Sequence, residues 1–378
     1  MKQISRRKFS ALAGSLAGGL LVSGIPLPMG RMRSRQEGKK LGIALVGLGS
    51  YSTYQLAPAL RQTEHCYLAG IVTGTPAKAE KWMREYGIGQ AHVYDYENFD
   101  QIASDDAIDI VYVVLPNSMH AEFSIRAARA GKHVICEKPM ALNVAECDAI
   151  IEACKRAGVK LGMGYRLHSE PYTREIKRLV RENTFGQVRF VSADAAYISG
   201  GNPDQWRLNK ALSGGGALMN MGVYAIQSCI YSCGKNPVSV SAQEFSTRPG
   251  YFKQTDETIT AQFTFPGGTV GQMMTSHNAS ANRLYASCDK GWFELQPANN
   301  YGPLSGRSSE GAISFPHESQ QKLQMDDFAR HILEGTPNRA PGEMGRRDIV
   351  IVEAIYRSIR EGGRTVPIDL PEGYGFGG

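Results

Sequence analysis

The stretch Leu41-Gly-Ile-Ala-Leu-Val46, followed by Gly47-Leu-Gly49-Ser50-Tyr51-Ser52, decides the fold of this chain. The apolar run predicts a buried strand, the glycines predict a tight turn, and a helical pattern continues to about Thr63. A strand, a glycine turn and a helix in this order open a dinucleotide-binding unit, although Ser52 stands in the third glycine position. We therefore expect the turn to contact a pyrophosphate through Gly47, Gly49, Ser50 and Tyr51.

Apolar runs and helical segments alternate after this unit. The runs lie at 67–72, 108–115, 133–136 and 160–164, and helical patterns separate them at 77–86, 120–130 and 144–157. Such alternation predicts a parallel, doubly wound sheet with helices on both faces. We expect this α/β Rossmann domain to span residues 41–165.

The chain changes character after about Asn183. Segments typical of strands cover 187–197, 238–246, 257–265, 269–276, 283–288 and 291–295. They predict an α+β domain over residues 166–370 with one large, mostly antiparallel sheet, whose open face suits homo-oligomer formation. A helix from about Leu218 to Cys233 is expected to cross towards the first domain. Two last helices, near 319–334 and 343–361, are expected to pack on the sheet or on the Rossmann edge.

The charge of the chain is concentrated at its start. The formal net charge is +6 over 378 residues, but residues 1–40 hold nine Lys or Arg and one acid, which is +8, so the other 338 residues sum to −2. A nearly neutral body lacks the electrostatic footprint of a nucleic-acid-binding protein.

The basic start has the order of an export signal. Ser5-Arg6-Arg7-Lys8-Phe9 precedes an uncharged stretch from Ala11 to Leu27. This order predicts a twin-arginine signal over residues 1–30, read by the export machinery, then a short arm over 31–40 and a periplasmic location. No Ala-x-Ala site marks a cleavage point, so an uncleaved membrane anchor stays open as an alternative.

Cysteine and histidine spacing predicts neither a disulfide framework nor a metal site. Seven cysteines are an odd number in a chain large enough to fold without cross-links. No His/Cys cluster has the spacing of zinc ligands.

Lys138 closes the apolar run His133-Val-Ile-Cys-Glu137-Lys138-Pro139. Ligands of open α/β sheets bind outside the carboxyl ends of the strands, so a lysine here would face the nucleotide crevice and could handle a substrate proton. A solvated surface lysine is the ordinary alternative, and the spacing alone leaves both open.

The end of the second strand bears on the choice of cofactor. NAD-dependent enzymes usually carry an acid there for the ribose 2′-hydroxyl, whereas this chain has Val72-Thr73-Gly74-Thr75-Pro76-Ala77-Lys78. Hydroxyls, free amides and a lysine suit a 2′-phosphate. We therefore expect NADP rather than NAD, held by Thr73, Gly74, Thr75 and Lys78. The alternative is an ordinary solvent-facing loop.

Three motifs carry a resemblance to a known family: Gly47-Leu-Gly49, Leu115-Pro116-Asn117-Ser-Met-His120 and Cys136-Glu137-Lys138-Pro139. In this order they make the chain resemble the Gfo/Idh/MocA oxidoreductases from Lys40 to about Ile368. Within the family, the segments 205–210 and 214–224 are similar to those of glucose-fructose oxidoreductase and the aldose-aldose oxidoreductases.

The resemblance implies hydride transfer between a sugar carbon and the nicotinamide, with Lys138 beside the nicotinamide. It makes Tyr224 the acid-base group, at a position where many members have histidine. An unperturbed tyrosine titrates near pH 10, so Lys138 is expected to lower that value. An aromatic core residue on an apolar helix is the alternative reading of Tyr224.

The resemblance also assigns binding residues. Asn220 stands where the motif usually has aspartate, and it is expected to bind the sugar together with Arg166 and His168. Cofactor contacts are implied for Pro116, Asn117, His120, Glu137, Lys138, Arg166, Trp206 and Arg207.

Three functions remain open at this point. The first is an exported NADP-dependent aldose oxidoreductase that keeps its cofactor and works by ping-pong turnover with a second sugar. The second is a simple sugar or anhydrosugar dehydrogenase or reductase with exchangeable NAD(P), which the short arm from Pro26 to Lys40 favours. The third is a non-enzymatic nucleotide-binding sensor on the same fold.

Overall fold

The structure of the protein is a computed structural model that describes Gly38 and residues 40–370. The predicted export signal, and all but two residues of the predicted arm, lie outside the described residues. The described residues form one compact unit.

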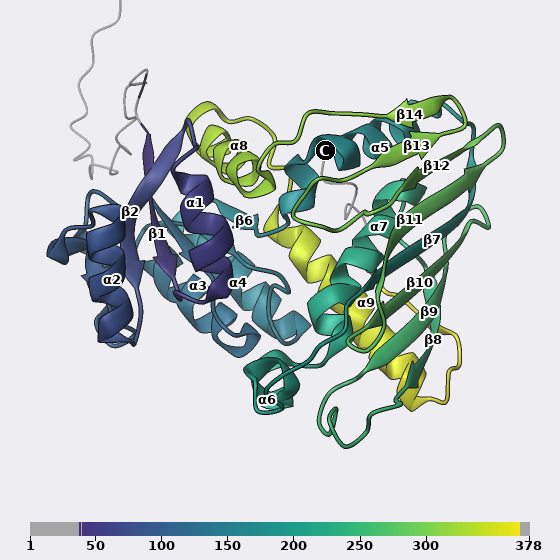
Figure 1. Cartoon of the computed structure of the whole chain (residues 1–378), viewed down its shortest axis with the longest axis horizontal. Coiled ribbons are helices and arrows are strands. Elements are labelled where there is room, and N and C mark those ends of the chain that lie inside the picture. The colour runs from purple at the N-terminus through teal and green to yellow at the C-terminus, as the bar shows by residue number, and fades with distance from the viewer. Residues whose placement is uncertain (1–37, 39, 371–378) are drawn as a thin grey trace, which may run out of the picture. The chain divides into compact units, whose positions relative to one another are not determined.

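A six-stranded parallel sheet forms the first lobe (Figure 1). Its spatial order is β3-β2-β1-β4-β5-β6, so the order reverses beside β1, where such sheets bind ligands. The strands are β1 (Leu41–Val46), β2 (Cys66–Val72), β3 (Val93–Tyr94), β4 (Ile110–Val113), β5 (His133–Cys136) and β6 (Leu161–Met163). The helices are α1 (Ala57–Leu60), which continues a π-helical turn at Ser52–Leu56, α2 (Pro76–Tyr86), α3 (His120–Arg129) and α4 (Val144–Ala157). The predicted Rossmann sheet is confirmed.

A nine-stranded sheet forms the second lobe, in the order β14-β13-β12-β11-β7-β10-β9-β8-β15. Only β7 and β10 pair in parallel; every other neighbouring pair of these described strands is antiparallel, as predicted. The strands are β7 (Val188–Ala196), β8 (Ser239–Phe245), β9 (Thr258–Thr264), β10 (Val270–Ser276), β11 (Ala281–Cys288), β12 (Trp292–Leu295), β13 (Gly306–Ser308), β14 (Gly311–Ile313) and β15 (Val366–Pro367).

Five α-helices follow β6 in the described chain: α5 (Pro171–Arg181), α6 (Lys210–Ser213), α7 (Val223–Cys233), α8 (Gln320–Glu334) and α9 (Gly342–Arg360). Figure 1 shows α7 and α9 along one face of the large sheet. The sequence patterns did not indicate α5. It begins at Pro171, and the side chain of Glu170 caps it by accepting a hydrogen bond from the Thr173 amide.

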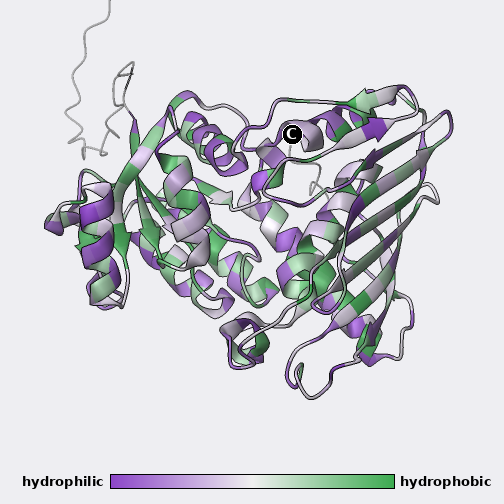
Figure 2. Ribbon diagram, in the orientation of Figure 1, coloured by the Kyte–Doolittle hydropathy of each residue, from purple (hydrophilic) through white to green (hydrophobic). Residues whose placement is uncertain are grey.

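The two sheets differ in burial because helices cover the first on both faces and the second on one. All six residues of β1 are buried, whereas buried and more exposed residues alternate along β9. Figure 2 shows the same contrast in hydropathy, with apolar strands in the first lobe and mixed strands in the second.

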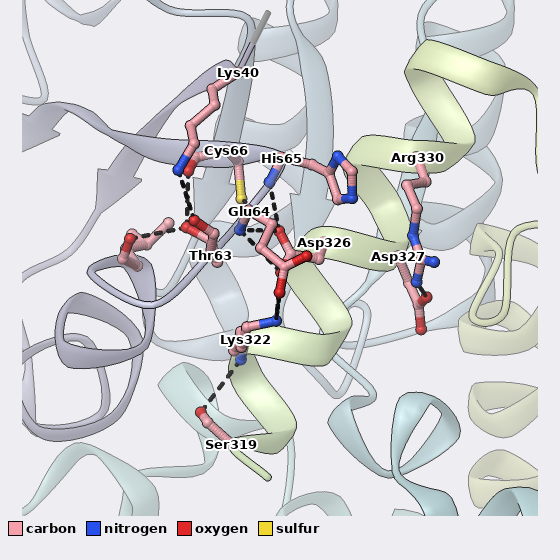
Figure 3. Close-up of polar contacts among 11 residues, drawn as sticks. Lys40, Thr63, Glu64, His65, Cys66, Ser319, Lys322, Asp326, Asp327 and Arg330 are labelled. Carbon is pink, nitrogen blue, oxygen red and sulfur yellow. Dashed lines mark hydrogen bonds and ion pairs between the residues drawn. The ribbon is translucent and has the colours of Figure 1, made fainter. Parts of the chain in front are cut away.

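Helix α8 completes the Rossmann lobe from far along the chain. Met325, Phe328 and Ala329 belong to the same buried cluster as β1. The Asp326 carboxylate accepts hydrogen bonds from the amides of Glu64 (3.0 Å) and His65 (2.9 Å), as Figure 3 shows. The other buried cluster runs from β1 through the large sheet to Ile368. Because this cluster includes residues of both sheets, it marks no boundary between two domains. The predicted division into 41–165 and 166–370 therefore stays a prediction.

No helix in the part of the chain that the structure describes is long and apolar enough to cross a bilayer. The predicted anchor segment is not among these residues.

Candidate functional site

A cavity of about 1100 Å³ opens where the strand order of the parallel sheet reverses. It is larger than the roughly 300–1,000 Å³ typical of sites for drug-sized ligands, so it has room for a dinucleotide and a second small molecule. Every site residue predicted from the sequence lines it except His168.

The glycine turn after β1 presents main chain to the cavity. Gly47 has a φ of +92°, and a Cβ there would overlap the Val114 carbonyl, so only glycine fits. Gly49 has open space where its Cβ would lie. The buried hydroxyl of Ser52 donates to the Gly47 carbonyl at 2.6 Å, which explains how serine replaces the third glycine of the motif.

The loop after β2 forms another part of the wall. The Thr75 amide donates to the Thr73 hydroxyl at 3.2 Å, and α2 starts at Pro76. Lys78, in the first turn of α2, is exposed and lines the cavity. A helix start, two threonine hydroxyls that can still donate, and a lysine make this corner suited to a phosphate.

His120 ties two cavity loops together. Its Nδ1 lies 2.8 Å from the Pro139 carbonyl and its Nε2 lies 2.9 Å from the Leu115 carbonyl. Asn117 crosses to the second lobe, where its Nδ2 donates to the Ser213 carbonyl at 2.8 Å. Both side chains therefore fix the shape of the wall.

Lys138 follows β5 and reaches the second lobe. Its Nζ donates to the Asn220 carbonyl at 2.9 Å and lies 4.7 Å from the centre of the Tyr224 ring. Burial lowers its pKa to about 8, Glu137 opposes that shift, and the guanidinium groups of Arg207 and Arg166 add to it. A lysine with such a pKa can exchange protons near neutrality.

Two cations, Lys138 and Arg166, lie near the Tyr224 ring, and the charge of Arg166 has the larger effect on the pKa of Tyr224. Burial raises the pKa of Tyr224, and the nearby charge of Arg166 opposes the rise. The sequence predicted that Lys138 lowers the pKa of Tyr224 below its ordinary value. That prediction is wrong, because the pKa of Tyr224 is raised. The guanidinium lies 5.3 Å from the Tyr224 ring centre, and its Nη atoms donate to the carbonyls of Asn299 (2.7 Å) and Asn300 (3.0 Å).

Glu137 supplies a buried carboxylate beside these cations. Tyr112 donates to its Oε1 at 2.6 Å and the Lys138 amide donates to its Oε2 at 3.2 Å. Burial raises the pKa of Glu137, and these hydrogen bonds and the Lys138 charge work against that rise.

Asn220 and Tyr224 come from the glycine-rich turn and the helix that follows it. The Asp256 carboxylate holds this turn by accepting hydrogen bonds from the amides of Gly216 (2.7 Å) and Leu218 (2.8 Å), and from the Tyr356 hydroxyl (2.6 Å). Trp206 and Arg207 precede the turn, with the guanidinium 4.4 Å from the indole ring centre.

His168 does not contact the cavity, which corrects the expectation that it binds the sugar. Its Nε2 lies 2.7 Å from Gln227 Oε1 and its Nδ1 lies 2.8 Å from Lys177 Nζ. Arg166 and His168 share a 3₁₀ turn, in which residues two apart point in different directions.

The sequence did not indicate several lining residues. The segment Asn299–Gly302 comes between β12 and β13, and the Tyr301 ring stacks on Tyr51 with centroids 5.9 Å apart. Only its turn-forming composition gave a signal, which marks a loop but no chemistry. The other missed lining residues are Leu48, Tyr96, Val114, Leu115, Pro139, Tyr197, Ser213, Gly215, Gly216, Met219 and Met221.

The donor set fits a dinucleotide and offers no metal site. Open space at Gly49 and the helix start beside it can receive a pyrophosphate. Among residues 38 and 40–370, no group of three or more His, Cys, Asp or Glu side chains is placed to hold a metal ion. None of the seven cysteines forms a disulfide.

Comparisons with known proteins agree with this reading. Residues 41–165 match the family described as "Oxidoreductase family, NAD-binding Rossmann fold", and residues 173–294 match the Gfo/Idh/MocA C-terminal domain. The chain is 30% identical over 337 residues to D-xylose 1-dehydrogenase (NADP+) of Haloarcula marismortui, covering 86% of this chain and 92% of that protein. It is 26% identical to levoglucosan dehydrogenase of Pseudarthrobacter phenanthrenivorans, over 80% of this chain and 83% of that protein.

One solved structure is considerably closer in sequence. The crystal structure of aldose-aldose oxidoreductase from Caulobacter crescentus, complexed with glycerol, superposes with a TM-score of 0.84. The two sequences are 42% identical, over 87% of this chain and all of that one. This chain belongs to the Gfo/Idh/MocA oxidoreductase family.

Proposed function

We infer that this protein is an NADP-dependent sugar oxidoreductase that transfers hydride between C1 of an aldose and the nicotinamide. The observation that carries this function is the meeting of Lys138 and Tyr224, 4.7 Å from Nζ to ring centre, in the cavity that also contains the glycine turn. The 42% identity to an aldose-aldose oxidoreductase and the NADP(+)-linked xylose dehydrogenases among the relatives support the substrate and cofactor classes.

The first wall of the cavity binds the cofactor. Main chain at Gly47–Ser50 receives the pyrophosphate, and Thr73, Thr75 and Lys78 receive the 2′-phosphate. When bound, the nicotinamide accepts or gives the hydride. Trp206 and Arg207 border the same cavity from the second lobe.

The residues of the other wall manage the proton. Since burial raises the pKa of Tyr224, its phenol is protonated at neutral pH and can donate to a carbonyl oxygen when a sugar is reduced. When an aldose is oxidised, the Tyr224 phenol first gives its proton to water in the cavity, the hydride then leaves C1, and the hydroxyl proton of the sugar passes to the tyrosine oxygen. Arg166 and Lys138 are the cations near enough to stabilise that phenolate.

Two modes of turnover fit this chemistry. In ping-pong turnover one sugar reduces a retained NADP and a second sugar reoxidises it, a mode favoured by the likeness to an aldose-aldose oxidoreductase. In the second mode NADP exchanges with solution, as in an ordinary dehydrogenase; the xylose and levoglucosan dehydrogenases among the relatives favour it.

One experiment tests the function and separates the modes. Purified protein is denatured and any released nucleotide is identified; native protein is then mixed with a panel of aldoses and ketoses while the nicotinamide absorbance is followed. Ping-pong turnover predicts about one NADP(H) per chain, reduced by one sugar and reoxidised by another without added nucleotide. Protein that neither contains nor binds NADP would refute the proposed function.

We also propose export and self-association. Residues 1–30 would direct the protein to the periplasm by the twin-arginine route, which is tested by exchanging Arg6 and Arg7 for lysine and measuring periplasmic protein. The open sheet face carries Phe245 and the stacked rings of Tyr285 and Trp292, with centroids 6.3 Å apart. Light scattering on wild type and on a Phe245→Glu, Tyr285→Glu double variant tests whether this face joins copies of the chain.

A further inference from the structure

The side chain of Asn220 is held from the second lobe. Its Nδ2 donates to the Tyr197 hydroxyl at 3.1 Å and lies 3.0 Å from His277 Nε2. Tyr197 directly follows β7 and His277 directly follows β10, the neighbouring parallel strand, so both come from the same edge of the large sheet. Neither residue was indicated by the sequence as part of a site.

His277 is a rigid partner for this amide. It is 1% exposed, its amide donates to the Glu257 carbonyl at 2.9 Å, and its carbonyl accepts from the Ser199 amide at 2.7 Å. Its ring lies between Tyr197 and Phe252, with centroids 5.0 and 6.4 Å away. The ring therefore has little freedom to turn.

A neutral His277 ring can accept the hydrogen bond from the Asn220 amide, whereas a protonated ring cannot. Burial lowers its pKa to about 4; Asp256 opposes the shift, while Arg207 and Lys138 add to it. The ring is neutral at pH 7, and a neutral imidazole has one donor and one acceptor nitrogen. With the Asn220 amide nitrogen facing Nε2, Nε2 is the acceptor and the proton is on Nδ1, which is buried and has no hydrogen-bond partner among the described residues.

Asn220 Oδ1 is left for a ligand. Both amide hydrogens are directed to Tyr197 and His277, and Asn220 lines the cavity. The backbone carbonyl of Asn220 accepts a hydrogen bond from Lys138 Nζ. The side chain therefore belongs to a residue that directly contacts the proposed proton-transfer lysine. An oxygen acceptor that faces the cavity can accept a hydrogen bond from a sugar hydroxyl.

We propose that His277 and Tyr197 are positioning residues that fix the Asn220 amide with its oxygen towards the substrate, so that Asn220 is a neutral acceptor for the C2 hydroxyl of an aldose. This inference rests on the proposed function. It gives a physical role to the asparagine that stands where related motifs usually have aspartate. The two oxygens of a carboxylate are equivalent, so a carboxylate needs no such orientation. An amide has one oxygen and one nitrogen, so neighbouring groups must fix which of the two faces the sugar.

The test compares an aldose with its 2-deoxy analogue in wild type, His277→Phe, His277→Gln and Tyr197→Phe. Loss of one neutral hydrogen bond corresponds to a change of roughly 3-fold to 10-fold. His277→Phe, which removes the acceptor but keeps a ring, should raise KM for the aldose by this factor and leave kcat nearly unchanged. KM for the 2-deoxy sugar should not change, and His277→Gln, which supplies an amide oxygen, should restore part of the discrimination.

Tyr197→Phe keeps the test decisive if a His277 variant folds poorly, because Tyr197 is partly exposed and loses only its hydroxyl. It should reduce discrimination between the two sugars to a smaller degree. NADP content, measured in each variant after denaturation, should stay at the wild-type level.

The outcomes separate this inference from the function on which it rests. If wild type oxidises aldoses but His277→Phe and Tyr197→Phe keep the full preference for the 2-hydroxyl, the inference is wrong and the function stands. An equal rise of KM for both sugars would show a merely structural role and overturn it too. If wild type neither binds nor oxidises any aldose, the proposed function itself fails.

Discussion

The two walls of the cavity are built from different material. The Rossmann wall includes main chain at strand ends, at Gly47, Gly49 and the loop after β2, whereas the opposite wall presents side chains such as Tyr224, Asn220 and Arg166. Backbone contacts depend on conformation and are specified locally. Side-chain contacts depend on individual residues that distant elements hold in place. The first wall should therefore fail through changes of backbone shape, and the second through loss of single functional groups.

The largest effect is expected where the walls meet. Lys138→Ala and Tyr224→Phe should each lower sugar-dependent reduction of bound NADP by about 100-fold to 10,000-fold, the range of general acid-base contributions. Nucleotide content should remain, because the proposed phosphate contacts lie elsewhere, at Gly47–Ser50 and in the loop after β2. Single-turnover absorbance measures the rate. Lys290→Ala, an exposed lysine outside the cavity, is the matched control; an equal loss in that variant would contradict the assignment.

The Rossmann wall can be broken in two distinguishable ways. Gly47→Ala places a side chain at φ +92° and against the Val114 carbonyl, which should lower the free energy of unfolding by about 1–2 kcal/mol from the backbone alone and further from the overlap. Gly49→Ala meets nothing within 4 Å, so its stability should equal that of wild type.

Nucleotide affinity then distinguishes the two glycines. Gly49→Ala should bind NADP several-fold more weakly because the methyl group occupies the approach to the pyrophosphate. Urea unfolding and nucleotide titration measure the two properties. Wild-type affinity in Gly49→Ala would mean that the turn does not bind the pyrophosphate.

Acid should weaken both lobes through buried histidines. Burial lowers the pKa of His277 in the sheet lobe and of His133 in the Rossmann lobe to about 4. In the unfolded chain these rings take up a proton below about pH 6.5, while in the folded protein they stay neutral. The free energy of unfolding should therefore fall as pH decreases from about 6.5 to about 4.

The size of this effect is about 3 kcal/mol for His277, from about 1.4 kcal/mol per pKa unit. Urea unfolding at a series of pH values tests it in wild type, His277→Gln and His133→Gln. In each variant the free energy of unfolding should fall less between about pH 6.5 and about pH 4, because the variant lacks the contribution of one histidine. Unchanged slopes in both variants would show that other groups cause the acid sensitivity.

The smallest effect concerns the support of the side-chain wall. Asp256→Asn should lower the free energy of unfolding by about 1–2 kcal/mol, because the amide group cannot accept from both turn amides. Its kcat should fall more than its nucleotide affinity, since the turn carries Asn220 and Tyr224. Tyr356→Phe removes one of the three hydrogen bonds and should cost less than Asp256→Asn. A larger loss of stability in Tyr356→Phe than in Asp256→Asn would mean that Asp256 is not the main support of the turn.

The comparison also explains what the sequence could reveal. Glycines at a positive φ and a lysine at a strand end are local signals, so the fold class, the glycine turn and the position of Lys138 were predictable. The loop at Asn299–Gly302 was not, because it meets Arg166 across more than 130 positions of the chain. His168 was misplaced because a 3₁₀ turn separates it in direction from Arg166, although they are two residues apart.

The contact between α8 and the first two strands has a consequence for synthesis. Asp326 binds the Glu64 amide across 262 positions, and Phe328 fills the core beside β1. A nascent chain that has just left the ribosome with all six Rossmann strands still exposes the apolar face that α8 will cover. The nucleotide-binding lobe is thus among the first parts to be made and among the last to be finished.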